Sequence, residues 1–351
     1  MAASVLTPTG DDAPVGAVSQ PRMPLPVPRG PISRALVDHL TSPTPDPGVI
    51  LASVDDLPAQ ILHDEDVQIS LAMLYELHLR GIVGVDDSAE WDPDLIRARA
   101  VIERRLAADL EALIGPVEDP GDVATELFRL GAHDGGPPLS AHLAFNGSID
   151  QFREWVIHRS LNQLRESDVH TFGIPRLHGA PKAGLIEVQI DEYGNGHVDY
   201  MHATLWATMM RGIGLDSDYA AYIDQIPAPS LAVVNTLSYL GLHRGLVREL
   251  MGHLCMVETT SALPCRAYSR GLRRLGFGSD VRRFFDEHVE ADSVHEQLVI
   301  RRVAVPLGDS PAARIALIRG ARICAAVENI AADHIWQSWE RGTTSLRPVT
   351  R

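Results

Sequence analysis

The chain has 351 residues, of which 45% are hydrophobic, so it is long enough for one large domain or two modest ones with a substantial core. The formal net charge of −15 argues against nucleic acid as a partner, because such binding depends on neutralising phosphates with lysine and arginine. Cys255, Cys265 and Cys324 are scattered and match neither a zinc motif nor a disulfide framework, which predicts reduced thiols in a cytoplasmic protein.

Residues 1–48 contain many prolines together with glycine and serine, and the clearest stretch is PRMPLPVPRGP. This composition, which lacks periodicity, predicts a disordered tail. The N-terminus lacks the basic region and apolar stretch of a secretory signal. No apolar run reaches the ~18 residues needed to span a bilayer, so we expect no membrane partner.

Helical periodicity begins at about residue 60 and continues to the C-terminal region. Residues 67–82 carry an apolar stripe, and residues 91–115 begin with Asp-Pro and end at glycine, which suits a helix start and a helix end. Further helices are expected over residues 121–132, 137–145, 149–167, 181–193, 199–213, 217–224, 229–239, 241–261, 263–275, 278–303, 309–328 and 329–340. Since no alternating strand and no βαβ pattern is found, the predicted fold class is all-α, with a bundle-like domain.

The stretch FFDEHVEADSVHEQL contains an unusual row of titratable side chains. In a helix, His288, Asp292 and His295 lie within about 60° of one another, on the stripe that also carries Phe284 and Leu298. Burying three such groups is costly unless something compensates them. A divalent metal would do so, because imidazole and carboxylate are common ligands. The alternative is a hydrogen-bonded His–Asp pair with a second histidine at the edge.

Other helices carry single titratable groups on apolar faces. Glu258 lies on a face with Met251 and Leu254, although an acid near a helix end can also be solvated. Glu192 and His202 lie on either side of Gly-Asn-Gly at residues 194–196, which favours a turn, so helical spacing need not relate them.

Two choices stay open at the level of pattern. Glu187 and Asp191 are rival acids to Glu192, on a face that we expect to be more exposed. On the helix expected over residues 149–167, His158 and Glu166 are both candidates, and a solvated Glu166 near the helix end is an equal alternative.

The pattern therefore collects three histidines and at least three carboxylates from three or four helices. Non-haem di-iron and di-manganese proteins are built with such a set in a bundle core. Oxygen and nitrogen donors without thiolate suit Fe(II) or Mn(II) better than a structural zinc.

These residues resemble those of the haem-oxygenase-like di-iron oxidases, the iron-containing redox enzymes of many actinobacteria. The most specific part is HVEADSVH, which matches the family's His-x₃-Asp-x₂-His; Glu258 precedes it by thirty residues, and Glu192 and His202 are ten apart. An additional carboxylate that some members carry twenty-six residues before the second one corresponds to Glu166 here. The ligand set that the resemblance implies is Glu166, Glu192, His202, Glu258, His288, Asp292 and His295, with Glu166 and Glu258 also as catalytic carboxylates.

The resemblance implies a haem-oxygenase-like helical domain over residues 49–345. Within it we expect accessory helices over 49–148, metal-binding core helices over 149–303 and C-terminal helices over 304–345. It further implies two iron ions per chain, with manganese as an alternative. The implied partners are O₂, a small substrate bearing a carboxylate or an amine, and an external electron donor. The implied reaction is N-oxygenation, desaturation or C–C cleavage, and a homodimer is an expected assembly.

Two other functions remain as alternatives. One is a non-catalytic helical protein that binds iron or manganese. The other is a thiaminase-like hydrolase on the same fold, for which Cys255 would be the nucleophile. For the oxidase, Arg159, Arg176 and Lys182 are candidates to bind a substrate carboxylate.

Overall fold

The computed structural model describes residues 21–132 and 135–348, except for the side chains of residues 290–294. Within these residues the regular structure is helical and no β-strand forms, which confirms the predicted all-α class. The helices are α1 (Pro31–Thr41), α2 (Pro47–Ser53), α3 (Glu65–Glu76), α4 (Pro93–Ile114), α5 (Val123–Gly131), α6 (Leu139–Phe145), α7 (Ile149–Gln163), α8 (Glu166–Thr171), α9 (Gly179–Glu192), α10 (His202–Gly212), α11 (Ala228–Leu242), α12 (Val247–Thr260), α13 (Ala262–Arg274), α14 (Ser279–Leu298), α15 (Val305–Leu307) and α16 (Pro311–Glu340).

Local sequence explains most helix boundaries. The Asp92 side chain accepts hydrogen bonds from the backbone N–H groups of Asp94 and Leu95, Pro93 occupies the first turn, and Gly115 ends α4 with a positive φ. The helix expected over residues 91–115 is therefore confirmed. In the described part of the chain, no helix is both long enough and apolar enough to cross a membrane.

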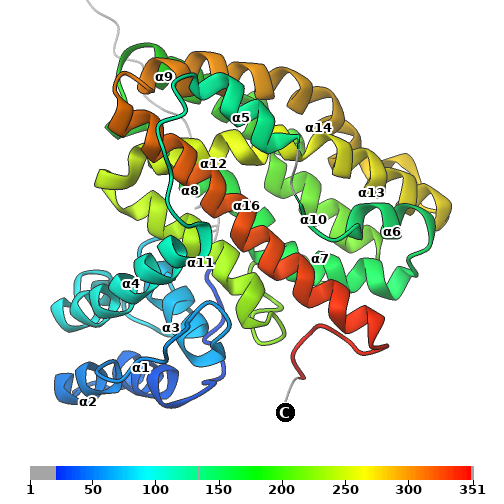
Figure 1. Cartoon of the computed structure of the whole chain (residues 1–351). Coiled ribbons are helices and arrows are strands. Elements are labelled where there is room, and N and C mark those ends of the chain that lie inside the picture. The colour runs from blue at the N-terminus through cyan, green and yellow to red at the C-terminus, as the bar shows by residue number, and fades with distance from the viewer. Residues whose placement is uncertain (1–20, 133–134, 349–351) are drawn as a thin grey trace, which may run out of the picture.

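The helices form two groups (Figure 1). Helices α1 to α4 gather at one end, where α1 packs on α2 and α3, and α3 packs on α11. Helices α5 and α6 instead contact the larger group, α5 against α12 and α16 and α6 against α13. Helix α16 crosses the molecule and packs along α12 and α11. The two helices expected over residues 309–328 and 329–340 are thus one continuous helix in the core.

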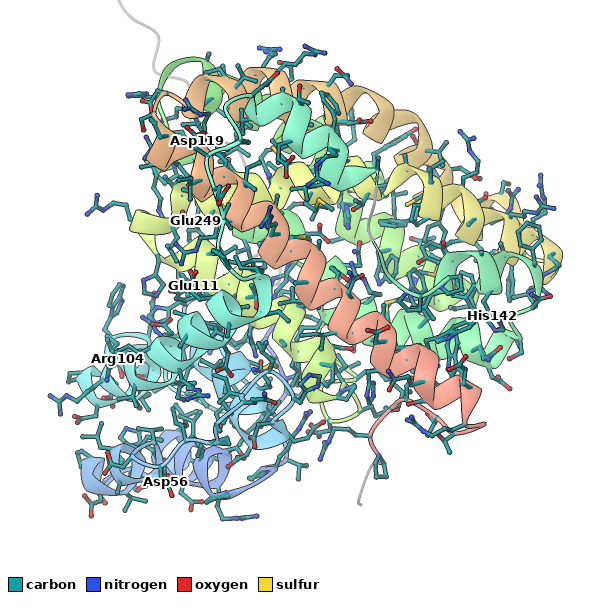
Figure 2. The ribbon with its side chains drawn as sticks, in the orientation of Figure 1. Asp56, Arg104, Glu111, Asp119, His142 and Glu249 are labelled. Carbon is teal, nitrogen blue, oxygen red and sulfur yellow. The ribbon has the colours of Figure 1, made fainter. Side chains whose placement is uncertain are left out.

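Helices α12 and α16 approach each other very closely. A Cβ atom at Gly320 would lie 2.0 Å from the carbonyl oxygen of Glu249, and one at Gly252 would lie 1.9 Å from that of Leu317. Arginines of α16 also pair with acids on neighbouring segments, for example Arg314 with Asp119 at 2.5 Å. Figure 2 labels three acids that pair with these arginines, Glu111, Asp119 and Glu249. These ion pairs are partly exposed and contribute little to stability. The position of α12 therefore depends mainly on its close contact with α16.

Two expectations from the sequence are wrong. The tail predicted over residues 1–48 is ordered where the structure describes it: Met23 is fully buried, and Asp66 accepts hydrogen bonds from the backbone N–H groups of Ile32 and Ser33 at the start of α1. The remaining part of that prediction, residues 1–20, lies outside the described residues. The helix expected over residues 217–224 is a series of turns, in which Ala220 has a φ of 57°.

Other predicted helices are interrupted. The segment 149–167 divides into α7 and α8 at Leu164–Arg165. The segment 241–261 begins with the last two residues of α11, continues as a short 3₁₀ turn and becomes α12 from Val247. The segment 278–303 is α14 followed by a π-helical stretch, Val299–Ala304. These interruptions depend on tertiary contacts that hydrophobic periodicity does not report.

Gly320→Ala is expected to destabilise the protein by about 3 kcal/mol, near the upper end for overpacked sites. Alanine has a helix propensity about 1 kcal/mol better than glycine, but a clash with backbone cannot be relieved by moving a side chain. Chemical denaturation measures the change. Gly245→Ala is the control, because a Cβ there meets no atom within 4 Å; equal stability of the two variants would contradict the close helix contact.

Candidate metal centre

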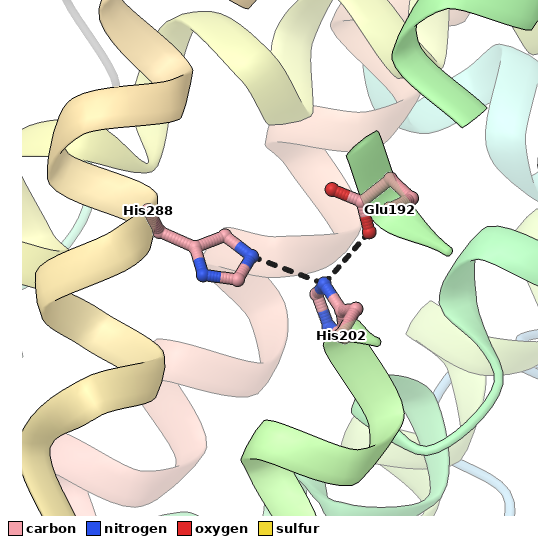
Figure 3. A group of neighbouring side chains, drawn as sticks. All are labelled: Glu192, His202 and His288. Atoms are coloured by element: carbon pink, nitrogen blue, oxygen red, sulfur yellow. Dashed lines mark hydrogen bonds and ion pairs between the residues drawn. The ribbon is translucent and has the colours of Figure 1, made fainter. Parts of the chain in front are cut away.

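Four helices bring the predicted side chains together. Glu192 ends α9, His202 begins α10, Glu258 lies in the last turn of α12, and His288 and His295 project from α14. Figure 3 shows Glu192, His202 and His288 pointing toward one another from three of these helices. His202, Glu258 and His295 are buried. The titratable side chains that the sequence places on apolar helix faces therefore do come together in the core.

The turn between α9 and α10 allows this convergence. Gly194, Asn195 and Gly196 all have positive φ angles, and a Cβ at Gly194 would lie 2.7 Å from the backbone nitrogen of Met201. The chain therefore reverses tightly, as the Gly-Asn-Gly sequence predicts. As a result, Nδ1 of His202 lies 2.8 Å from Oε2 of Glu192.

Hydrogen bonds set the proton positions on the two histidines. His288 donates from Nδ1 to the carbonyl oxygen of Phe284 at 2.7 Å, so its Nε2 carries the lone pair. Gln163 donates from Nε2 to Glu166 at 3.0 Å, which directs the Gln163 Oε1 toward Nε2 of His202 at 2.7 Å. Nε2 of His202 therefore carries a proton, which leaves Nδ1 as the ring nitrogen that can bind a cation.

Three electron-pair donors thus face one point. Nδ1 of His202 lies 3.1 Å from Nε2 of His288 and 2.8 Å from Oε2 of Glu192. Burial, and then the neighbouring His202, lowers the pKa of His288 to about 4. Burial alone would raise the pKa of Glu192, but its contacts with the histidines and with Ser167 hold that pKa below its ordinary range. A proton on Nδ1 of His202 can form a hydrogen bond with only one of its two neighbours, Glu192 or His288. A cation can accept an electron pair from all three side chains.

A second group of donors lies on the other side of Glu192. Nδ1 of His295 is 3.3 Å from Oε2 of Glu258, and its Nε2 is 3.0 Å from Oδ2 of Asp191. Burial raises the pKa of Glu258. Burial opposes a charge on His295 as well, but Glu258 and Asp191 outweigh it and raise the pKa of His295 to about 10. The Nδ1 proton of a charged His295 occupies the place beside Glu258 that a cation would take.

Glu192 belongs to both groups. The ligand atoms of Glu192, His202 and His288 lie within 4.8 Å of one another, and so do those of Glu192, Glu258 and His295. A carboxylate has two oxygens and can bridge two cations, and these donors are all oxygen or nitrogen. The residues therefore fit a pair of divalent cations that share Glu192.

Residues 153–329, about half of the chain, match the family model described as iron-containing redox enzyme. The chain belongs to the iron-containing redox enzymes. The predicted resemblance is confirmed, and both groups of donors lie inside the matched range.

The nitrosourea synthase of Streptomyces achromogenes subsp. streptozoticus is a relative of this iron-containing redox enzyme. It is 29% identical over 168 residues, which are 47% of this chain and 36% of the relative. The match therefore spans about a third of that longer protein.

Two crystal structures of a CADD-like protein of unknown function from Nostoc punctiforme PCC 73102 share the fold. Each has a TM-score of 0.50 to this redox enzyme. The structure at 2.00 Å is 17% identical and covers 62% of this chain and 97% of its own; the structure at 1.35 Å is 15% identical and covers 66% and 98%. At such low identity the likeness concerns the fold alone.

The two candidates on the segment 149–167, Glu166 and His158, have different surroundings. Both ring nitrogens of His158 are engaged, with the hydroxyls of Ser230 at 2.8 Å and Ser345 at 2.7 Å. Glu166 instead lies beside the two donor groups, and its Oε2 accepts hydrogen bonds from Asn162 and Gln163. Burial raises the pKa of Glu166 to about 7. The remaining predicted ligand, Asp292, has a side chain outside the described residues.

Two neighbours of the centre, Gln163 and Ser167, were not expected from the sequence. Gln163 orients His202, and Ser167 donates a 2.6 Å hydrogen bond to Glu192. Asp191 is half-exposed, as expected, but it pairs with His295. Gln163 and Ser167 flank the break between α7 and α8, and no periodic signal marks them. Only the position of Gln163 three residues before Glu166 hints at its contact.

A cavity of about 260 Å³ in the redox enzyme opens onto the centre. Its walls include Glu166, Glu192, His202, Glu258 and His288. Its apolar lining includes five aromatic side chains, those of Trp155, Trp206, Tyr268, Phe284 and Phe285. A second cavity reaches Glu192, His202, His288 and His295 from the side of the 194–200 turn, so the centre is approached from two sides.

Of the candidate substrate anchors, Arg159 lines the first cavity, where it pairs with Glu328 at 2.6 Å. Arg176 donates hydrogen bonds to the carbonyl oxygens of Gly241 and Leu242 and supports the backbone there. Cys255 is fully buried, and burial raises the pKa of its thiol. A nucleophilic thiolate needs the opposite environment, which disfavours the thiaminase-like alternative.

Glu192→Ala is expected to reduce iron binding to background, because Glu192 belongs to both donor groups. Glu258→Ala is expected to retain about half of the wild-type iron, because it removes a donor from one group only. Iron per chain after anaerobic loading with Fe(II) measures both. Glu187→Ala is the control, since Glu187 is an exposed acid on the same helix. Full iron content in Glu192→Ala would contradict the shared carboxylate.

Proposed function

We propose that this iron-containing redox enzyme is a di-iron oxidase or oxygenase that uses O₂ to oxidise a small substrate bearing a carboxylate or an amine. The observation that supports it best is the sharing of Glu192 by two donor groups. One position would be held by Glu192, His202 and His288, and the other by Glu192, Glu258 and His295. Glu166 and Asp292 are the proposed additional carboxylates.

Bound iron would supply the reduction of O₂ and the oxidising power, which no side chain of the protein can provide. The described residues prepare the donors for it. Phe284 and Gln163 orient the imidazoles of His288 and His202, and fixed orientation of ligands strengthens metal binding. Aromatic side chains of the cavity exclude water from the reacting region, which limits side reactions.

The cavity supports catalysis over storage. A storage or structural site needs no space beside it, whereas the walls of this cavity contain ligand candidates and an aromatic surface together. The Arg159–Glu328 pair provides opposite charges in the same wall, which supports a substrate with a carboxylate or an amine. Among the three reaction types, the name of the nitrosourea synthase favours N-oxygenation, because a nitrosourea contains oxidised nitrogen.

The protein loaded with Fe(II) under anaerobic conditions is expected to bind about two iron ions per chain and to consume O₂ on mixing. A transient absorption in the visible region should accompany the uptake, and a substrate should accelerate its decay. Stopped-flow spectroscopy and an oxygen electrode measure these, with Glu192→Ala as the inactive control. Stable Fe(II) protein that takes up no O₂ with any amine or carboxylic acid in a panel would instead indicate a non-catalytic iron-binding protein.

Arg159→Gln is expected to raise KM for the best carboxylate-bearing compound of such a panel roughly 30-fold, which corresponds to about 2 kcal/mol. The expected change in kcat is small, because Arg159 would bind the substrate away from the iron. Arg153→Gln on the same helix is the control, since Arg153 pairs with Asp150 and Ile213 instead. Arg159→Gln alone also leaves Glu328 without its partner. The double variant Arg159→Gln/Glu328→Gln removes that effect, so any remaining rise in KM is due to the loss of the anchor. An unchanged KM in both would contradict the assignment of the anchor.

A further inference from the structure

Helix α8 connects the metal centre to the N-terminal helices. It has only six residues, and no side chain caps its first turn. An isolated helix of this length is unstable in water, so its orientation must come from its neighbours. Four consecutive residues at its start, Arg165 to Asp168, divide their contacts: the middle two face the metal centre, and the outer two pair with the N-terminal part of the chain.

The contacts toward the centre are those of the second and third residues. Glu166 lies in the cavity wall and receives hydrogen bonds from Asn162 and Gln163. Ser167 donates its hydroxyl to Oε2 of Glu192 at 2.6 Å. The side chain of Ser167 therefore supports the carboxylate that both donor groups share.

The contacts away from the centre begin with Arg165. Its guanidinium lies 3.2 Å from Oε2 of Glu76, the last residue of α3, and donates to the hydroxyl of Ser238. Tyr219 donates to the same Glu76 carboxylate at 2.9 Å. Arg165 and Glu76 are almost completely buried, at 3% and 1% exposure of their side chains. A buried charge pair with additional hydrogen bonds is specific in geometry, because losing one partner leaves the other charge uncompensated.

Asp168 makes the second outward contact. It accepts a 2.8 Å hydrogen bond from Arg80, which follows α3, and Arg80 also donates to the carbonyl oxygen of Leu164 at the break before α8. On its other oxygen, Asp168 accepts a 2.8 Å hydrogen bond from the hydroxyl of Tyr193. Tyr193 directly follows Glu192 in the chain. Arg80 is thus linked through one carboxylate to the end of α9.

We propose that the N-terminal helices position the metal centre, with Glu76 and Arg80 as positioning residues that hold α8 against Glu192. The pairs Glu76–Arg165 and Arg80–Asp168 hold both ends of the short segment that carries Glu166 and Ser167. The N-terminal helices are then an integral part of the centre and not an accessory. This inference rests on the proposed function, because it concerns the geometry of the proposed ligands.

The test uses the full chain with Arg80→Met and, separately, Asp168→Asn. Asp168→Asn keeps the size of the side chain and an oxygen that accepts from Tyr193, and it removes both the charge and the oxygen that accepts from Arg80. Hydrogen exchange of the metal-free protein is compared for the peptides that cover residues 164–171 and 188–193. We expect faster exchange there than in wild type, with α12 and α16 unchanged. Arg22→Met is the control, because Arg22 lies in the same N-terminal part of the chain and its side chain pairs with Asp87 and Val85.

Titration with Fe(II) follows on the same variants. Partners that orient metal ligands typically change affinity 10- to 100-fold, and for these more distant residues we expect about tenfold weaker binding. The near-infrared circular dichroism of the Fe(II) centre should change as well, which a loss of overall stability alone would not cause. Wild-type exchange in the α8 peptides, or wild-type iron affinity and spectrum, would overturn the proposal even if Tm falls. If the wild-type protein binds no iron, the proposed function fails, and the exchange measurement still decides whether the Arg80–Asp168 pair holds α8.

Discussion

Burial of several carboxylates and histidines in one apolar core is the constraint on which the rest of this structure depends. Charged groups lose hydration on burial and persist only where partners compensate them. Here the compensation centres on Glu192, which contacts His202 and Ser167 and lies within ligand distance of both donor groups. The hydrogen bonds that orient His202 and His288 leave one ring nitrogen of each close to the same carboxylate. A pair of cations would satisfy these donors more completely than protons do.

The helix interruptions near the centre follow from the same constraint. The break before α8 separates the inward Glu166 from the outward Arg165, and the 194–196 turn reverses the chain between Glu192 and His202. A π-helical stretch, Val299–Ala304, follows the helix that carries His288 and His295. Such stretches are rare and frequently occur at functional sites. Regular helices through these points would carry the ligand side chains past one another.

The remaining helices give this irregular region a rigid frame. Helices α12 and α16 pack at the short distance that Gly252 and Gly320 permit. This contact fixes the position of α12, the helix that carries Glu258. The N-terminal part of the chain contacts the α8 segment through buried and half-buried ion pairs. The aromatic cavity lies within this frame, so its shape and the positions of the ligand candidates depend on the same packing.

The sequence by itself determined the all-α class, most helix positions and the family, because hydrophobic periodicity and the spacing of HVEADSVH are local properties of the chain. It also identified Glu192, His202, Glu258, His288 and His295 as isolated titratable groups on apolar stripes. Only the tertiary structure decided that Glu192 is common to two groups of donors and that His158 is occupied by Ser230 and Ser345. It likewise decided that residues 21–48 are ordered and that Gln163, Ser167 and Asp191 complete the surroundings of the centre. Those facts depend on contacts between segments far apart in the chain, which a one-dimensional pattern of side chains does not contain.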